Sequence, residues 1–121
     1  MKYILLLFVF PLFFSTTSKV EWVTPLEHDF GDIIHKKPVE HFFKFKNTTS
    51  EPILIDNVRT TCGCTTPDWT WEPIAPDSTS HIRVVFDAKK TGFFKKRVKV
   101  FLSNQKKATI LKISGYVESM K

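Results

Sequence analysis

Hydrophobic and polar side chains alternate with a period of two along much of this chain. The alternation is clearest in four segments, at 40–46, 80–87, 95–102 and 109–117. Successive side chains of a β-strand point to opposite faces, so each segment is predicted to be a strand with one buried face. Shorter strands are expected at 27–30, closed by Gly31, and at 52–55, leading to the cysteines. The inward positions predict a core made of Phe43, Phe45, Ile55, Ile82, Val84, Phe86, Val98, Val100, Leu111 and Ile113.

Residues that favour turns separate these strands, at 47–50, 75–78, 90–92 and 103–105. No segment has the apolar spacing of a stable amphipathic helix. About seven short strands joined by such turns predict an all-β, immunoglobulin-like β-sandwich. This sandwich is expected to lack the usual disulfide between its two sheets, because Cys62 and Cys64 are too close in sequence to bridge them.

The first 18 residues have the composition of a secretory signal peptide. A charged start is followed by a 12-residue apolar run, from Tyr3 to Phe14, and then by small polar residues up to Ser18. A transmembrane helix needs roughly 20 apolar residues, so removal after about Ser18 is favoured over the alternative of an uncleaved membrane anchor. We therefore expect a signal peptide at 1–18 and one domain at 19–121. The mature chain is expected to be exported, periplasmic or extracellular, and without a transmembrane segment.

The chain carries a formal net charge of +6, with lysine pairs spread along its length. Positive charge favours anionic partners, but none of the nucleic-acid-binding motifs is present. We expect a protein or a cell-envelope component as the partner, and the sequence leaves the oligomeric state open. The segment 95–99 holds four basic residues. It is interpreted either as a surface for acidic polysaccharide or membrane, or as protection of an exposed sheet edge against aggregation.

Cys62 and Cys64 are the only cysteines, and a single glycine separates them. Three interpretations remain open: a structural turn, a redox-active disulfide, and a metal site. An oxidising compartment favours pairing, and a turn at Gly63 brings the two Cα atoms within disulfide range. Two thiolates favour Cu(I) or Zn, but no histidine lies at a recognisable ligand spacing from them. The histidines considered as further ligands are His28, His35, His41 and His81.

Three other residues invite more than one interpretation. Trp69 and Trp71 lie two residues apart, and they form either an aromatic binding patch or a cap on the core. Asn47, followed by two threonines, fits both a glycosylation acceptor and a turn residue. No nucleophile motif, close carboxylate pair or phosphate-binding loop is found, so a non-enzymatic protein without a cofactor is expected.

Several of these segments together resemble the domain-of-unknown-function family 1573 (DUF1573). The matching segments are His28 to Gly31, Phe43 to Ile55, Asn57 to Thr65, Pro73 to Pro76, Ile82 to Asp87, Gly92 to Lys96 and Ser103-Asn104. The chain departs from the family at Thr49 and Asp77, where a turn glycine is common. The resemblance implies an exported bacterial protein, often from Bacteroidetes. It also implies an immunoglobulin-like domain similar to the major-sperm-protein and pilus-chaperone types, and it supplies no activity.

Two functional hypotheses follow from the sequence. The first is a small exported, non-enzymatic immunoglobulin-like module with a binding or structural role. The second is a thiol-based protein that handles electrons or a metal, Cu or Zn, through Cys62 and Cys64.

Overall fold

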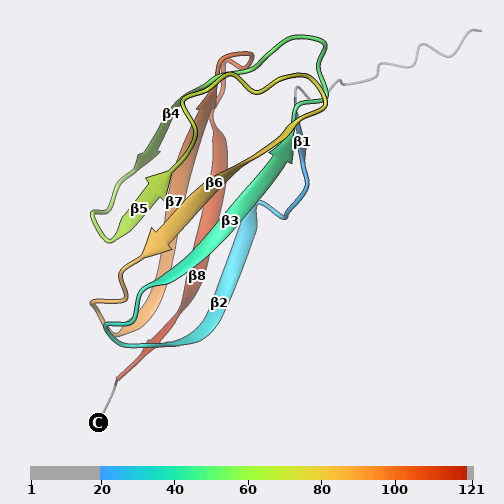
Figure 1. Cartoon of the computed structure of the whole chain (residues 1–121). Helices are drawn as coiled ribbons and strands as arrows, with labels where there is room; N and C mark the ends of the chain where they lie inside the picture. Colours follow the sequence, from blue (N-terminus) through green and yellow to red (C-terminus); the bar gives the residue numbers. More distant parts are fainter. Residues whose placement is uncertain (1–19, 120–121) are drawn as a thin grey trace, which may run out of the picture.

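The computed structural model describes residues 20–119, which form two four-stranded β-sheets packed face to face (Figure 1). The first sheet has the order β1 (Glu21–Trp22), β3 (Val39–Lys46), β6 (Thr79–Phe86) and β5 (Thr65–Asp68). The second sheet has the order β2 (Glu27–Ile34), β8 (Thr109–Glu118), β7 (Gly92–Leu102) and β4 (Ile55–Thr60). All strand pairs are antiparallel except β2 and β8, which are parallel. The predicted immunoglobulin-like sandwich is confirmed, with eight strands in place of about seven.

The core lies between the two sheets and is built from the alternating strand positions. All ten predicted core residues are buried, and Phe43, Phe45 and Ile82 are fully so. The alternation places these side chains on the inner face, while the lysines between them remain exposed or half-buried. The predicted faces of the four long strands are therefore confirmed.

A stack of two aromatic rings closes one end of the core. Phe86 of β6 and Phe94 of β7 stack with ring centroids 3.9 Å apart, which joins the two sheets. Gly115 of β8 makes room for this stack, since a Cβ atom there would lie 2.8 Å from the Phe94 ring and 2.9 Å from the Gly31 carbonyl oxygen. A side chain at position 115 would therefore displace the Phe94 ring that borders the site described below.

The shorter strands differ from the sequence prediction. The strand expected at 52–55 is wrong in position: β4 begins at Ile55, and Ile53 forms only an isolated bridge with Ile74. The strand expected to close at Gly31 continues to Ile34, because Gly31 adopts φ +69° in a bulge where the register shifts. The two edge strands β1 and β5 are short and were not predicted.

Two expectations concern the N-terminal segment and the membrane. The predicted signal peptide at 1–18 lies outside the described residues. Within residues 20–119, no helix has the length and apolarity needed to span a bilayer.

Asn47 is one of two buried polar residues among those described. Its amide nitrogen donates to the carbonyl oxygens of Glu51 (2.8 Å) and Ile74 (2.9 Å). Its side-chain oxygen accepts from the Thr49 backbone N–H at 2.9 Å and from the Thr49 hydroxyl at 2.6 Å. The structure therefore favours the turn interpretation of Asn47, because its side chain is fully buried and a glycan on the amide nitrogen would replace one of the two N–H groups that donate.

Candidate functional site

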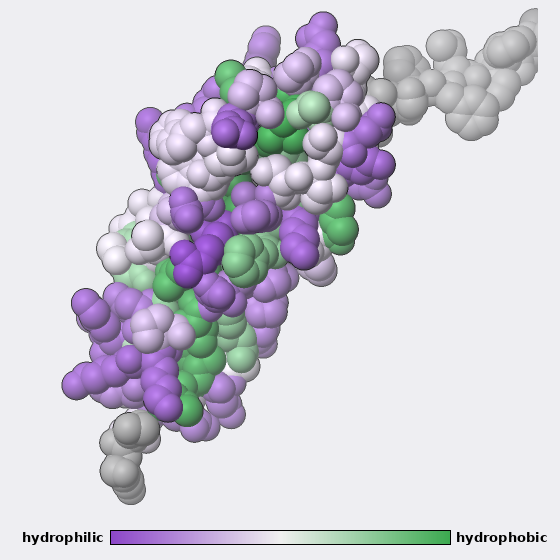
Figure 2. Space-filling view, viewed as in Figure 1, coloured by the Kyte–Doolittle hydropathy of each residue, from purple (hydrophilic) through white to green (hydrophobic). Residues whose placement is uncertain are grey.

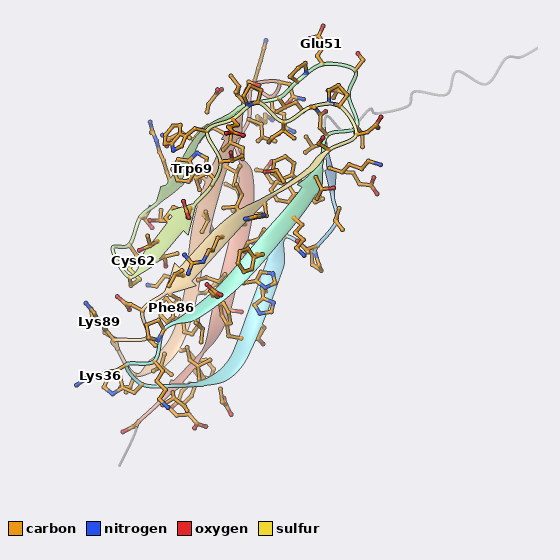
Figure 3. All side chains as sticks on the ribbon, in the orientation of Figure 1. Lys36, Glu51, Cys62, Trp69, Phe86 and Lys89 are labelled. Atoms are coloured by element: carbon orange, nitrogen blue, oxygen red, sulfur yellow. A yellow bond between two sulfur atoms is a disulfide. The ribbon has the colours of Figure 1, made fainter. Side chains whose placement is uncertain are left out.

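The Cys-Gly-Cys segment forms the corner where the chain leaves β4 of the second sheet and enters β5 of the first (Figures 1 and 3). Cys62 and Cys64 form a disulfide there, with their Cα atoms 5.2 Å apart. Both residues are half-buried. The structure thus shows a disulfide, one of the states that the sequence left open, and places it at a change of sheet, where it is open to solvent on one side.

Main-chain hydrogen bonds hold this corner independently of the sulfur–sulfur bond. The Thr65 N–H donates to the Cys62 carbonyl oxygen at 3.2 Å, which closes a tight turn over 62–65. The Thr60 hydroxyl lies 3.2 Å from the carbonyl oxygens of both Cys62 and Thr65. The Asp87 N–H donates to the Cys64 carbonyl oxygen at 3.0 Å and ties the corner to the end of β6. The turn geometry is therefore set by the backbone as well as by the disulfide.

A cleft of about 390 Å³ opens beside the disulfide, and we call it the disulfide cleft. Both cysteines line it, together with the Phe86–Phe94 stack. Three lysines and one acid also reach it: Lys89, Lys90, Lys96 and Asp87. Cys62, Phe86 and Lys89 appear at the same end of the sandwich in Figure 3. The space-filling view of the same end shows hydrophilic side chains beside a hydrophobic strip (Figure 2). The disulfide is therefore surrounded by mostly positive charge.

A second, strongly basic hollow lies on the outer face of the second sheet, over β4 and β7. It has a volume of about 540 Å³ and is called here the basic groove. Its charged lining is entirely basic and consists of Arg59, Lys95, Lys96, Arg97 and Lys99. Arg59 and Lys99 stand directly opposite each other on adjacent strands. Like charges directly opposite each other on adjacent strands destabilise a sheet. An anion bound between Arg59 and Lys99 would relieve this repulsion, so the arrangement favours an anionic ligand.

The structure tests one sequence interpretation of this basic segment only in part. That interpretation placed residues 95–99 on an exposed edge, with the lysines preventing aggregation. Strand β7 lies inside the second sheet, but β4 pairs only with its residues from Val98 to Leu102, whereas β8 pairs with those from Gly92 to Val100. The β4 side of residues 95–97 therefore has no strand partner among the described residues, and both interpretations of the segment remain open.

The two tryptophans have different environments. Trp69 is half-buried and packs against the core, whereas Trp71 is 74% exposed. Their ring centroids lie 5.2 Å apart. Trp69 therefore caps the core, as one interpretation of the sequence predicted. Trp71 packs against Trp69 from the solvent side, and of these two tryptophans it alone is exposed and available for a binding patch.

Two of the four histidines, His28 and His41, stack on each other, and His35 and His81 contact other residues. His28 of β2 and His41 of β3 stack at 3.7 Å, across the gap between the two sheets. Burial, followed by the charge on His28, lowers the pKa of His41. His35 Nε2 lies 2.9 Å from the Lys89 carbonyl oxygen. Among residues 20–119, no three His, Cys, Asp or Glu side chains form a cluster that could hold a metal ion.

Sequence reasoning missed two residues of these surfaces. Arg59 was not connected with the basic segment, although its position three residues before Cys62 places it on the strand entering the corner. Phe93 is 90% exposed, contacts Tyr116 across the sheet and lines the disulfide cleft. Phe93 and Phe94 are adjacent on one strand, so only one of them can face the core, and this signal was available in the sequence.

Comparison with solved structures places the fold among known sandwiches. A protein of unknown function from Porphyromonas gingivalis W83 is 14% identical, with a TM-score of 0.70; the match covers 81% of this chain and 46% of that one. The ASH/PapD-like domain 7 of human CEP192 is 10% identical, with a TM-score of 0.71 and coverage of 85% and 87%. The YadV chaperone is 13% identical, with a TM-score of 0.51 and coverage of 85% and 54%.

The sequence comparisons add a family. A search of curated proteins found no match. The family profile described as a protein of unknown function, DUF1573, matches residues 21–117, which include the corner, both hollows and the whole sandwich except for its terminal residues. The chain belongs to the DUF1573 family.

Proposed function

We propose that this chain is a small exported, non-enzymatic binding module that holds an anionic component of the cell envelope in its basic groove. The single observation that supports the proposal is the charge of the groove, whose lining contains five basic residues and no acid. The apolar core fills the space between the sheets, so the outer face of the second sheet is a surface on which a ligand can be held. Export rests on the signal peptide predicted from residues 1–18.

The structure of the groove suits an extended anion better than a compact one. Lys95, Arg97 and Lys99 alternate along one face of β7, which separates them by about 7 Å per step. The Arg59 guanidinium lies 5.5 Å from the centre of the Phe101 ring, which gives the groove one flat apolar wall. At about 1 kcal/mol for each basic residue, five of them support a dissociation constant on the order of 10⁻⁴ M. Binding is therefore expected to be weak and sensitive to salt.

The test measures binding of a polycarboxylate polysaccharide, polygalacturonate, by calorimetry at low and at high salt. The double variant Arg59→Gln/Lys99→Gln is expected to bind about thirtyfold more weakly than the wild type at low salt, since it removes two contributions of about 1 kcal/mol each. The control is Lys106→Gln/Lys107→Gln, which removes the same charge from the exposed turn between β7 and β8. Equal losses in the two variants would show that only net charge matters, and would contradict a binding site in the groove.

A second function, thiol chemistry at the corner, is favoured by the lysines around the disulfide. Its metal-binding form has no further ligand among the described residues, because no cluster of three potential ligands is found there. Its redox form needs only the two cysteines and a suitable electrostatic environment, and the disulfide cleft supplies both.

A further inference from the structure

We propose that the Cys62–Cys64 disulfide exchanges with the dithiol of an exported partner protein, and that Cys62 is the sulfur that leaves as a thiolate. This inference rests on the second function named above and does not depend on ligand binding in the basic groove. It assigns a different role to each cysteine, and it assigns the lysines of the disulfide cleft to the reaction.

Access to the sulfur atoms is the first requirement. Both cysteines line the disulfide cleft, whose volume of about 390 Å³ is large enough for an incoming side chain. Gly63 has open space where a side chain would begin, since no atom outside residues 62–64 lies within 4 Å of an ideal Cβ there. A partner thiolate can therefore reach the pair without displacing core residues.

The two sulfur atoms have different surroundings. The backbone N–H of Cys64 donates to Cys62 Sγ at 3.2 Å. Cys64 packs in part against the hydrophobic core, and its sulfur has only a longer contact of 3.7 Å with the Thr65 hydroxyl, in which either group can be the donor. A thiolate is stabilised by hydrogen-bond donors and disfavoured by apolar surroundings. Negative charge is therefore better accommodated on Cys62 than on Cys64.

The positive charge in the disulfide cleft also stabilises a cysteine thiolate. Lys89, Lys90 and Lys96 line the cleft with one carboxylate, that of Asp87. That carboxylate also accepts the Lys89 backbone N–H at 3.1 Å. Neighbouring cations lower the pKa of a cysteine thiol and favour the reduced form of a disulfide. The lysines therefore make this disulfide a better electron acceptor than it would be in neutral surroundings.

The exchange proceeds in two balanced steps. A partner thiolate attacks Cys64 Sγ, the Cys62–Cys64 bond breaks, and its electron pair leaves on Cys62 as a thiolate. The second thiolate of the partner then attacks its own sulfur in the mixed disulfide and releases Cys64, which takes up a proton. The partner dithiol is oxidised to a disulfide by two electrons, and Cys62 and Cys64 receive those electrons.

The fold can accept both redox states. The turn over 62–65 is held by the bond from the Thr65 N–H to the Cys62 carbonyl oxygen, and the bond from Asp87 ties it to β6. Neither bond involves sulfur. Reduction therefore leaves the corner in place, with the two thiols side by side and ready for reoxidation.

The first experiment measures the equilibrium between the protein and a series of reduced and oxidised glutathione mixtures, with thiols trapped by alkylation and counted by intact mass. Lys89→Gln/Lys90→Gln is expected to shift the equilibrium toward the disulfide by about threefold or more. The matched control Lys106→Gln/Lys107→Gln removes equal charge far from the cleft and is expected to leave it unchanged. Circular dichroism of each variant checks that it folds. Equal equilibria for the two variants would overturn the role of the lysines.

The second experiment uses the fully reduced wild-type protein and a limiting amount of iodoacetamide near neutral pH. Peptide mapping is expected to find Cys62 alkylated before Cys64. Equal labelling, or earlier labelling of Cys64, would overturn the assignment of the leaving sulfur. A disulfide that glutathione cannot reduce in the folded protein would overturn the exchange itself. Polygalacturonate binding is measured separately, so failure here leaves the anion-binding proposal standing, and the reverse also holds.

Discussion

The side chain of Asn47 joins the loop after β3 to the loop before β6. It is fully buried and uses both its nitrogen and its oxygen in hydrogen bonds to Thr49, Glu51 and Ile74. The sequence indicated a turn residue here but not its burial. Asn47 stands in a polar segment, and it becomes buried only because the two loops close over it, a contact between positions far apart in the sequence.

Replacing Asn47 with alanine is predicted to lower the free energy of unfolding by about 2–4 kcal/mol. The carbonyl oxygens of Glu51 and Ile74 would each lose one of two donors, and the Thr49 N–H would lose its acceptor in a largely buried network. Urea unfolding measures the change. The control is Thr48→Ala, because Thr48 is exposed beside it. A loss below about 1 kcal/mol would contradict the network as described.

At the scale of the strands, the alternation of hydrophobic and polar residues predicted the four long strands and their buried faces. It did not predict the short strands β1 and β5. Strands β1 and β5 have two and four residues, which is too few for a period to appear. A disulfide was one of three interpretations that the spacing of Cys62 and Cys64 left open. The charge around it was not predicted, because Lys89, Lys90 and Lys96 come from the β6–β7 turn and the adjacent strand.

Strand β7 offers a prediction in which stability and binding move in opposite directions. Lys99→Glu is expected to raise the free energy of unfolding by about 0.2–1 kcal/mol, since it replaces a like-charge pair with Arg59 by an attractive one. The same change is expected to abolish polygalacturonate binding. Thermal unfolding and calorimetry measure the two effects, with Lys106→Glu as the control of equal charge. Lower stability together with unchanged binding would show that this face serves the fold alone.

At the scale of the whole molecule, the stacked rings of His28 and His41 connect the two sheets along their β2–β3 side. Phe30 and Phe43 face His41 edge-on from the same two strands, and His28 is the titratable group against it. Burial and then the His28 charge lower the pKa of His41 from its ordinary value. The unfolded chain therefore binds a proton at His41 at a higher pH than the folded protein does.

This difference makes stability depend on pH. The contribution of His41 is fully present above about pH 6.5, its ordinary pKa, and is lost as the pH falls through the lower folded value. Urea unfolding between about pH 8 and pH 5 is expected to show a shallower pH dependence for His41→Gln than for the wild type. The control His81→Gln removes an exposed histidine and is expected to keep the wild-type dependence. Identical curves for His41→Gln and the wild type would contradict the prediction.

The parallel pairing of β2 with β8 determines which end of the sandwich faces a partner when the protein is attached to a support. The described chain enters the sandwich near one end and leaves it at the other, where Cys62, Lys36 and Lys89 are found (Figures 1 and 3). A tether attached before residue 20 therefore displays the disulfide cleft outward, at the far tip. A tether attached after residue 119 holds that tip against the support. Immobilisation through the N-terminal side is thus the orientation that leaves the cleft open to a macromolecular partner.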